Sequence, residues 1–350
     1  LEGRDYHYVM FIRAGDQLPT GALARIRRSM ESTGADIVYG DVGLTEGVNK
    51  TAFDTSHGWV VIEQPLGDEI VRICDTFEPS PGILLDESFS LLSGLVIAKH
   101  ALKILVDTFG DTERLTAHLL LARAMTNDRK IDKCEEIFTV LGRNVSPPVD
   151  AIESLRVTNQ HLIPAVEAWA TKAGLEMLDL GAAHNPEPGY RSVDLEGASL
   201  NCDIRDGLPL PDSSVGVIRA VDFMEHINPC RDSSCDHGAS GQSKRCVVGV
   251  MNELYRVLVP GGWLFVRSPS SDGRGAFQDP THVSFWNPNS FWYYTRRDQR
   301  RFVRGIDCRF QAARLWQEFP DEWHRLHDIP YVYADLVALK GQRQPGLIEV

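Results

Sequence analysis

The stretch EMLDLGAA, residues 176–183, decides the fold of the second half of the chain. Residues 176–180 form a short, mostly apolar run that is typical of a buried strand, and Gly181 follows directly. In an open α/β sheet, ligands bind beyond the carboxyl ends of the strands. Because glycine has no side chain, Gly181 would let a ligand approach the backbone closely. On its own, this string is also compatible with an ordinary turn between a strand and a helix.

Two acidic residues further along strengthen the interpretation as a ligand site. Asp194 ends the next predicted strand, 190–194, where a carboxylate can accept hydrogen bonds from the hydroxyls of a ribose. Asp203 offers an acceptor-only side chain that suits an adenine amino group, with helix capping or a turn as the alternative. The spacing of the glycine and the acids therefore predicts an adenosine site.

The residues around this motif alternate between short apolar runs and helical patterns, which is the rhythm of a parallel sheet. A helix is predicted over 151–173 and another over 247–258, where Pro260, Gly261 and Gly262 then make a tight turn. The predicted strands are 176–180, 190–194, 215–220 and 262–268. The second half is therefore expected to be an α/β domain.

Four segments in this order resemble class I S-adenosylmethionine-dependent methyltransferases: DLGAA (179–183), SVDLE (192–196), CDIRDGLPLPDSSVGVIRAVDFMEHI (202–227) and MNELYRVLVPGGWLFVRSPS (251–270). The resemblance covers about residues 175–270 and continues more weakly to about 341. It implies a Rossmann-like methyltransferase sheet with S-adenosyl-L-methionine as the cofactor. Ala183 stands where the family usually has a second glycine. The residues that the resemblance assigns to cofactor binding are Asp179, Gly181, Ala183, Asp194, Asp203, Val221 and Asp222.

Three residues are candidates for catalysis. His282 lies in a stretch rich in aromatic residues, 279–294, beyond the predicted strand 262–268. Because histidine titrates near neutral pH, His282 could take the proton of a hydroxyl acceptor; the alternative is a hydrophobic lid around a hydrogen-bonded histidine. Glu225 and His226 follow the strand 215–220 and are further candidates, although their position favours capping a helix or packing beneath the cofactor.

Four residues that zinc prefers as ligands lie close together in the sequence, namely Cys230, Cys235, His237 and Cys246. Their spacing, C-x4-C-x-H-x8-C, lacks the usual C-x2-C pair, and the flanking residues are small and polar. The pattern therefore favours a solvated loop over a zinc site, and no metal is expected.

Residues 6–40 resemble the middle of a family 2 glycosyltransferase of the GT-A type. In that family an Asp-x-Asp motif holds the metal and the sugar nucleotide, but here Arg13 and Gly15 replace two of its positions and only Asp16 remains. A cation at position 13 would oppose a divalent metal. We therefore expect this half to be inactive as a glycosyltransferase.

The resemblances divide the chain into two domains. Residues 1–147 are expected to form a smaller, partial GT-A-like α/β domain, and residues 148–350 the methyltransferase domain, joined by a linker over 142–148. The fusion suggests O-methylation of a sugar or another small-molecule acceptor. The alternatives are a family 2 glycosyltransferase-related protein of glycan biosynthesis and a non-catalytic binding scaffold.

The composition of the 350 residues limits the partners and the compartment. A net charge of −12 argues against a general nucleic-acid binder. No apolar run approaches the ~20 residues that a membrane span needs. Seven cysteines, an odd number, and a polar start without a signal peptide favour a reducing interior, so the expected location is cytoplasmic. Nothing in the sequence indicates an oligomeric state.

Overall fold

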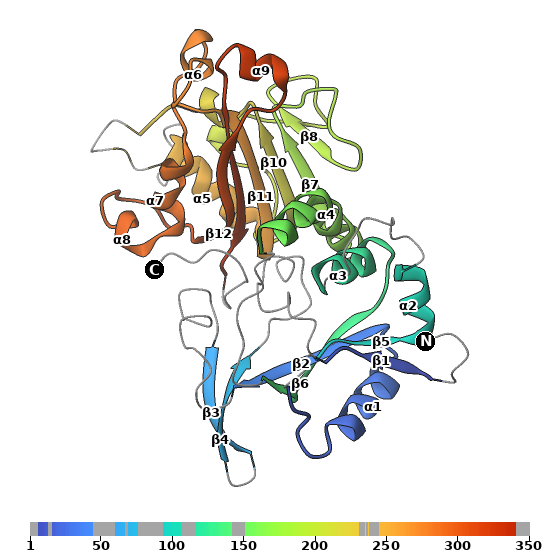
Figure 1. The fold of residues 1–350 in the computed structure, drawn as a ribbon. Coiled ribbons are helices and arrows are strands. Elements are labelled where there is room, and N and C mark those ends of the chain that lie inside the picture. The colour runs from blue at the N-terminus through green and yellow to red at the C-terminus, as the bar shows by residue number, and fades with distance from the viewer. Residues whose placement is uncertain are drawn as a thin grey trace. The chain divides into compact units, whose positions relative to one another are not determined.

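The computed structural model of the chain divides into two compact units, Leu1–Trp169 and Ala170–Val350 (Figure 1). The predicted linker lies outside the described residues, so the boundary after residue 147 stays a prediction. Arg13 and Gly15 also lie outside them. The residues that the structure describes are 6–12, 16–44, 60–66, 69–75, 94–106, 117–141, 151–230, 235, 237 and 245–340.

The first unit contains a mixed six-stranded sheet. Its strands are β1 (Tyr8–Met10), β2 (Ile37–Leu44), β3 (Val60–Leu66), β4 (Glu69–Asp75), β5 (Val96–Ala98) and β6 (Ile131–Leu141). They run in the order β1-β5-β2-β4-β3 with antiparallel pairs, and β6 pairs with β2 in parallel. Residues 6–40, which resemble a glycosyltransferase, contain β1 and the start of β2.

Helices α1 (Ala22–Thr33), α2 (Lys99–Val106) and α3 (Ala117–Thr126) complete the first unit. In α1, the side chains of Ala22, Ile26 and Met30 recur every four residues and are buried, which gives the helix one apolar face. Gly34 ends α1 in the left-handed conformation at φ 61°, and its amide donates to the carbonyl of Met30. Helix α4 (Ala151–Lys172) follows and covers the predicted helical segment.

The second unit is built on a seven-stranded sheet with the order β12-β13-β11-β10-β7-β8-β9 (Figure 1). Its strands are β7 (Glu176–Leu180), β8 (Arg191–Asp194), β9 (Leu200–Asn201), β10 (Val215–Val221), β11 (Leu258–Pro269), β12 (Phe310–Glu318) and β13 (Tyr331–Ala338). Strands β7 to β11 pair in parallel, whereas β13 runs antiparallel to β11 and β12. The carboxyl ends of the parallel strands therefore share one edge.

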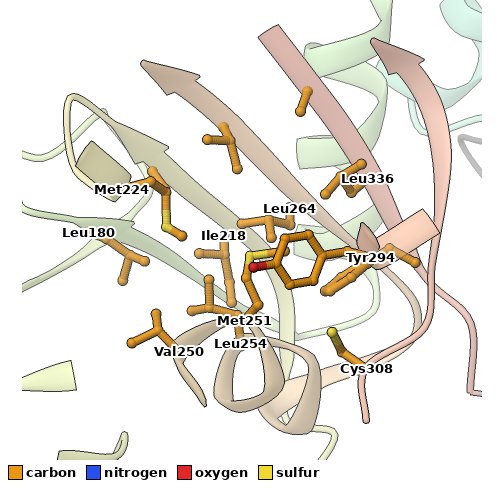
Figure 2. Close-up of a cluster of buried hydrophobic side chains, with 14 of the residues drawn as sticks. Leu180, Ile218, Met224, Val250, Met251, Leu254, Leu264, Tyr294, Cys308 and Leu336 are labelled. Carbon is orange, nitrogen blue, oxygen red and sulfur yellow. The ribbon is translucent and has the colours of Figure 1, made fainter. Parts of the chain in front are cut away.

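Helix α5 (Val247–Val257) connects β10 to β11 and seals the apolar core. Met251 and Leu254 of this helix point toward Ile218 of β10 and Leu264 of β11 (Figure 2). Short helical segments lie in the loops. They are η5 (Ile204–Asp206), η6 (Met224–His226), α6 (Gly275–Gln278), η7 (Pro288–Phe291), α7 (Trp292–Thr295), α8 (Arg297–Arg300) and α9 (Glu322–Leu326).

The predicted turn at 260–262 is observed as an irregularity at the start of β11. Val215 of β10 pairs with Leu258, but Val217 pairs with Trp263, so extra residues of β11 are looped out. Gly261 adopts φ 76°, and a Cβ at Gly262 would lie 3.0 Å from the carbonyl oxygen of Val259. Both glycines are therefore needed for the turn.

A buried ion cluster joins the three strands β11, β12 and β13. The side chain of Asp335 is fully buried, and its Oδ1 accepts a 2.6 Å hydrogen bond from Arg267. Its Oδ2 accepts a 2.7 Å hydrogen bond from Nε of Arg314. Strands β12 and β13 were not predicted, because such charges interrupt the apolar pattern of a buried strand.

Among the described residues, we find no helix that is both long and apolar enough to cross a bilayer.

Candidate cofactor and catalytic site

Gly181 and Asp194 lie together at the carboxyl ends of the neighbouring parallel strands β7 and β8. The amide of Gly181 donates to the carbonyl of Val193 over 2.8 Å, and the amide of Ala183 donates to Oδ2 of Asp194 over 3.1 Å. Both loop residues have positive φ, 76° for Gly181 and 43° for Ala183. The loop after β7 is thus folded onto the acid that ends β8.

Asp194 keeps hydrogen-bonding capacity for a ligand. Its Oδ1 accepts from the amide of Leu195 over 2.7 Å, and its Oδ2 accepts from Ala183. A carboxylate has about four lone-pair sites, so capacity remains for hydroxyl donors. The side chain is half-buried and therefore can be reached from solvent.

Gly181 also permits a close contact with the loop after β10. A Cβ at this position would lie 2.9 Å from Cδ2 of Phe223, which real side chains do not tolerate. Phe223 was not among the predicted site residues. Its position directly after Val221 and Asp222, which were assigned to the site, is the signal that could have identified it.

Asp179 holds the loop in place. It is only 6% exposed, and its Oδ2 accepts from the amide of Glu187 over 2.9 Å and lies 3.4 Å from the guanidinium of Arg219. Arg219 also donates to Glu187 over 2.7 Å. Glu187, in the loop after β7, is therefore hydrogen-bonded to β7 through its amide and to β10 through its side chain.

Asp203 caps the short helix η5. Its Oδ1 accepts from the amide and from Nε of Arg205, at 3.0 and 2.9 Å, and its Oδ2 accepts from the same guanidinium over 2.8 Å. This is the capping geometry that the sequence left open as an alternative. The carboxylate is held in one orientation at the start of η5.

Val221 and Asp222 end β10 and turn toward β11. The amide of Asp222 donates to the carbonyl of Arg267 over 2.9 Å, and its φ is 49°. Burial, together with the nearby Asp222 carboxylate, raises the pKa of Tyr331, which begins β13. Tyr331 is thus a polar residue at this edge of the sheet, and it was not identified from the sequence.

Glu225 is a buried carboxyl group with one unpaired oxygen. It is 1% exposed, its Oε2 accepts a 2.7 Å hydrogen bond from Ser268, and its Oε1 has no partner. Burial raises the pKa of Glu225 above the ordinary glutamate value. Its backbone carbonyl accepts from the amides of Val283 and Ser284, which pins the loop after α6 onto η6.

The structure brings His226 and His282 together beside Glu225. Their ring centroids are 5.0 Å apart at an interplanar angle of 74°, and the ligating atoms of all three residues lie within 4.8 Å of one another. Nδ1 of His282 is 3.1 Å from the carbonyl of Ala276. Because a carbonyl only accepts, Nδ1 is the donor in this contact, and Nε2, which lies 3.9 Å from Oδ2 of Asp279, carries the lone pair in the matching neutral tautomer. The three predicted catalytic residues therefore form one cluster that can accept a proton.

A second cluster contains Cys230, Cys235, His237 and Cys246, whose ligating atoms also lie within 4.8 Å of one another. The spacing of these residues in the sequence did not predict this proximity.

Comparisons with known proteins give structural neighbours only. No protein-family model matches the chain, and no curated protein sequence matches it. A SAM-dependent methyltransferase from Archaeoglobus fulgidus is 15% identical, with a TM-score of 0.30, over 49% of this chain and 92% of that one. The Burkholderia thailandensis 1,6-didemethyltoxoflavin-N1-methyltransferase is 13% identical, with a TM-score of 0.31, over 50% of this chain and 77% of that one.

A third structure, an S-adenosylmethionine-dependent methyltransferase from Mesorhizobium loti, is 14% identical, with a TM-score of 0.28, over 49% of this chain and 97% of that one. These neighbours are methyltransferases of low sequence identity, and they give no support for a GT-A domain in residues 1–147.

Proposed function

We propose that residues 148–350 form an S-adenosyl-L-methionine-dependent methyltransferase domain. The observation that carries this proposal is the pairing of Gly181 with Asp194 at adjacent strand ends, where the amide of Ala183 binds the acid. This arrangement sets a glycine loop and an acceptor carboxylate side by side at the carboxyl edge of the parallel strands, where an adenosine would bind.

The residues around this pair have distinct roles toward the cofactor. Asp194 would accept hydrogen bonds from the ribose hydroxyls, and the loop at Gly181, which has a positive φ, would face the methionine part. Asp203, held by Arg205 at the start of η5, contacts the adenine. Asp179 fixes the loop, whereas Ala183, Val221 and Asp222 line the site.

The bound cofactor supplies an electrophilic methyl group, and the protein mainly orients the acceptor toward it. We assign the general base to His282, whose Nε2 carries the free lone pair in the neutral ring. His226 and the buried Glu225 keep that imidazole in a polar setting, and the hydrogen bond to Ala276 fixes its orientation. The proton of an acceptor hydroxyl would pass to Nε2.

The acceptor class that we propose is a hydroxyl of a sugar or of another small molecule. Its support is the pair of histidines His226 and His282 at the strand edge and the sequence resemblance of residues 6–40. Residues 1–147 would then serve acceptor binding or packing as a partial, inactive GT-A-like domain.

Calorimetric titration of the full chain with S-adenosylhomocysteine tests the cofactor site. The wild type is expected to bind, and Asp194→Ala to bind about 5- to 150-fold more weakly, which corresponds to losing about 1–3 kcal/mol of hydrogen bonds to a charged group. Glu176→Gln is the matched control, because Glu176 is an exposed carboxylate at the opposite end of β7. Absence of heat from a folded wild-type sample would refute the proposal.

A further inference from the structure

The amino end of α5 carries a cluster of three sulfur atoms and one imidazole nitrogen. Nδ1 of His237 lies 3.2 Å from Sγ of Cys246 and 3.7 Å from Sγ of Cys230. The sulfur atoms of Cys235 and Cys246 are 3.9 Å apart. All four ligating atoms fall within 4.8 Å of one another.

These separations are those of a tetrahedral zinc centre. Zinc binds thiolate sulfur at about 2.3 Å and imidazole nitrogen at about 2.0–2.1 Å, so neighbouring ligands of a tetrahedron lie about 3.5–3.8 Å apart. The distances between ligating atoms, 3.2, 3.7 and 3.9 Å, lie close to that range. We propose that Cys230, Cys235, His237 and Cys246 form a structural zinc site.

The packing around His237 supports a built site rather than a solvated position. A Cβ at Gly249, inside α5, would lie 2.2 Å from the carbonyl oxygen of His237. A Cβ at Gly305 would lie 1.9 Å from Cδ2 of the His237 ring. Glycine inside a helix costs about 1 kcal/mol relative to alanine, and the close approach of His237 explains its presence here. Two segments distant in sequence thus leave room for this one histidine.

Cys246 stands at the amino end of α5. It is the N-cap residue of this eleven-residue helix and is 6% exposed, so its sulfur is held among the other ligating atoms and away from solvent. The preceding residue, Arg245, donates its amide to the carbonyl of Arg205 over 2.9 Å. A metal on Cys246 would therefore fix the start of α5 against η5.

Four protein ligands leave no open position for a water or a substrate, which is the mark of a structural and not a catalytic zinc. The site is also separate from the Glu225, His226 and His282 cluster, which contains no sulfur. This difference in ligand chemistry makes the two clusters distinguishable in an experiment.

The experiment uses the full chain, produced without a polyhistidine tag, in the presence of zinc and a reducing agent. Elemental analysis is expected to find about one zinc per chain. Replacement of the zinc by Co²⁺ is expected to give the intense visible bands of a tetrahedral ion and thiolate-to-cobalt charge-transfer bands. Cys235→Ser should lose the metal or bind it more weakly, whereas Cys202→Ser, which changes a half-buried thiol outside the cluster, should retain it.

Three results would overturn the proposal. One is a folded wild-type chain that binds neither zinc nor cobalt. Another is bound metal that survives Cys235→Ser but is lost in His282→Ala, which would place it in the other cluster. The third is a disulfide between Cys235 and Cys246 that persists under reducing conditions. If the cysteine variants do not fold, a strong chelator should lower the wild-type melting temperature, with recovery on adding Zn²⁺ but not Mg²⁺; an unchanged melting temperature would also count against the site.

Discussion

The hydroxyl of Ser268 donates a 2.7 Å hydrogen bond to Oε2 of Glu225, which joins the end of β11 to the helical turn η6 after β10. Both side chains are buried, and Oε1 of Glu225 has no partner among the described residues. Ionising this carboxyl group in the folded protein is therefore unfavourable, because few hydrogen bonds replace the water that would solvate the charge.

Stability should fall with rising pH through the ionisation of Glu225. Its pKa is raised in the folded state, mainly by burial, so the folded protein holds the proton to a higher pH than the unfolded chain. The stabilisation that the protonated carboxyl group provides is fully present below about pH 4.5, and it is lost as the pH rises through the folded-state pKa. Urea denaturation at a series of pH values should show this decline in the wild type but not in Glu225→Gln. Parallel curves for the two proteins would contradict it.

Gly181→Ala should lower the free energy of unfolding, because it strains the loop after β7 in two ways that can be measured separately. Alanine at φ 76° costs about 1–2 kcal/mol of backbone energy, and its Cβ would clash with Phe223 at 2.9 Å. Phe223→Ala in the same chain should recover the part due to the clash and leave the backbone part. Denaturation of the single and double variants measures both parts. A Gly181→Ala protein as stable as the wild type would show that the loop adapts.

His282→Ala should reduce methyl transfer far more than cofactor binding. General-base catalysis contributes about 10²–10⁴-fold to the rate, so turnover with a hydroxyl acceptor should fall by that order. Affinity for S-adenosylhomocysteine should stay near the wild-type value, because no cofactor contact is assigned to His282. A panel of sugar and small-molecule alcohols with labelled cofactor provides the assay. Equal turnover in the variant would show that His282 is not the general base.

Asp335→Asn should be strongly destabilising. The substitution leaves Arg267 and Arg314, which are 12% and 11% exposed, without their shared carboxylate, and breaking a buried pair costs about 3–5 kcal/mol. Asp298→Asn is the matched control, because Asp298 also pairs with an arginine, Arg296, but at the surface. Chemical denaturation should separate the two variants clearly, and equal midpoints would contradict the assigned role.

The sequence allowed much of the second unit to be predicted, for physical reasons. Strands β7, β10 and β11 contain apolar runs, and α5 has an apolar face, so simple periodicity identifies them. Strands β12 and β13 contain Arg314 and Asp335, whose charges neutralise each other only once the strands are paired. A pairwise effect of this kind does not appear in the pattern of one segment.

The site shows the same contrast. Gly181 and Asp194 follow predicted strands, so the edge at which they meet could be inferred. The three cysteines lie close to His237 because Gly249 and Gly305 leave space for that residue. The spacing of the four residues in the sequence does not predict this packing. The sequence favoured a metal-free loop there, and the zinc site that we propose is argued from the observed separations of these residues.

Asp335 also determines how the antiparallel edge of the sheet can be aligned. It stands directly opposite Arg314 across β12 and β13, after an irregularity that falls between Ala312 and Arg314. Because side chains alternate between the faces of a strand, sliding β13 by one residue would turn Asp335 to the other face and separate its carboxylate from both guanidinium groups. Misaligned pairings are therefore penalised electrostatically, and a single insertion or deletion in β13 should be tolerated far less than one in an exposed loop.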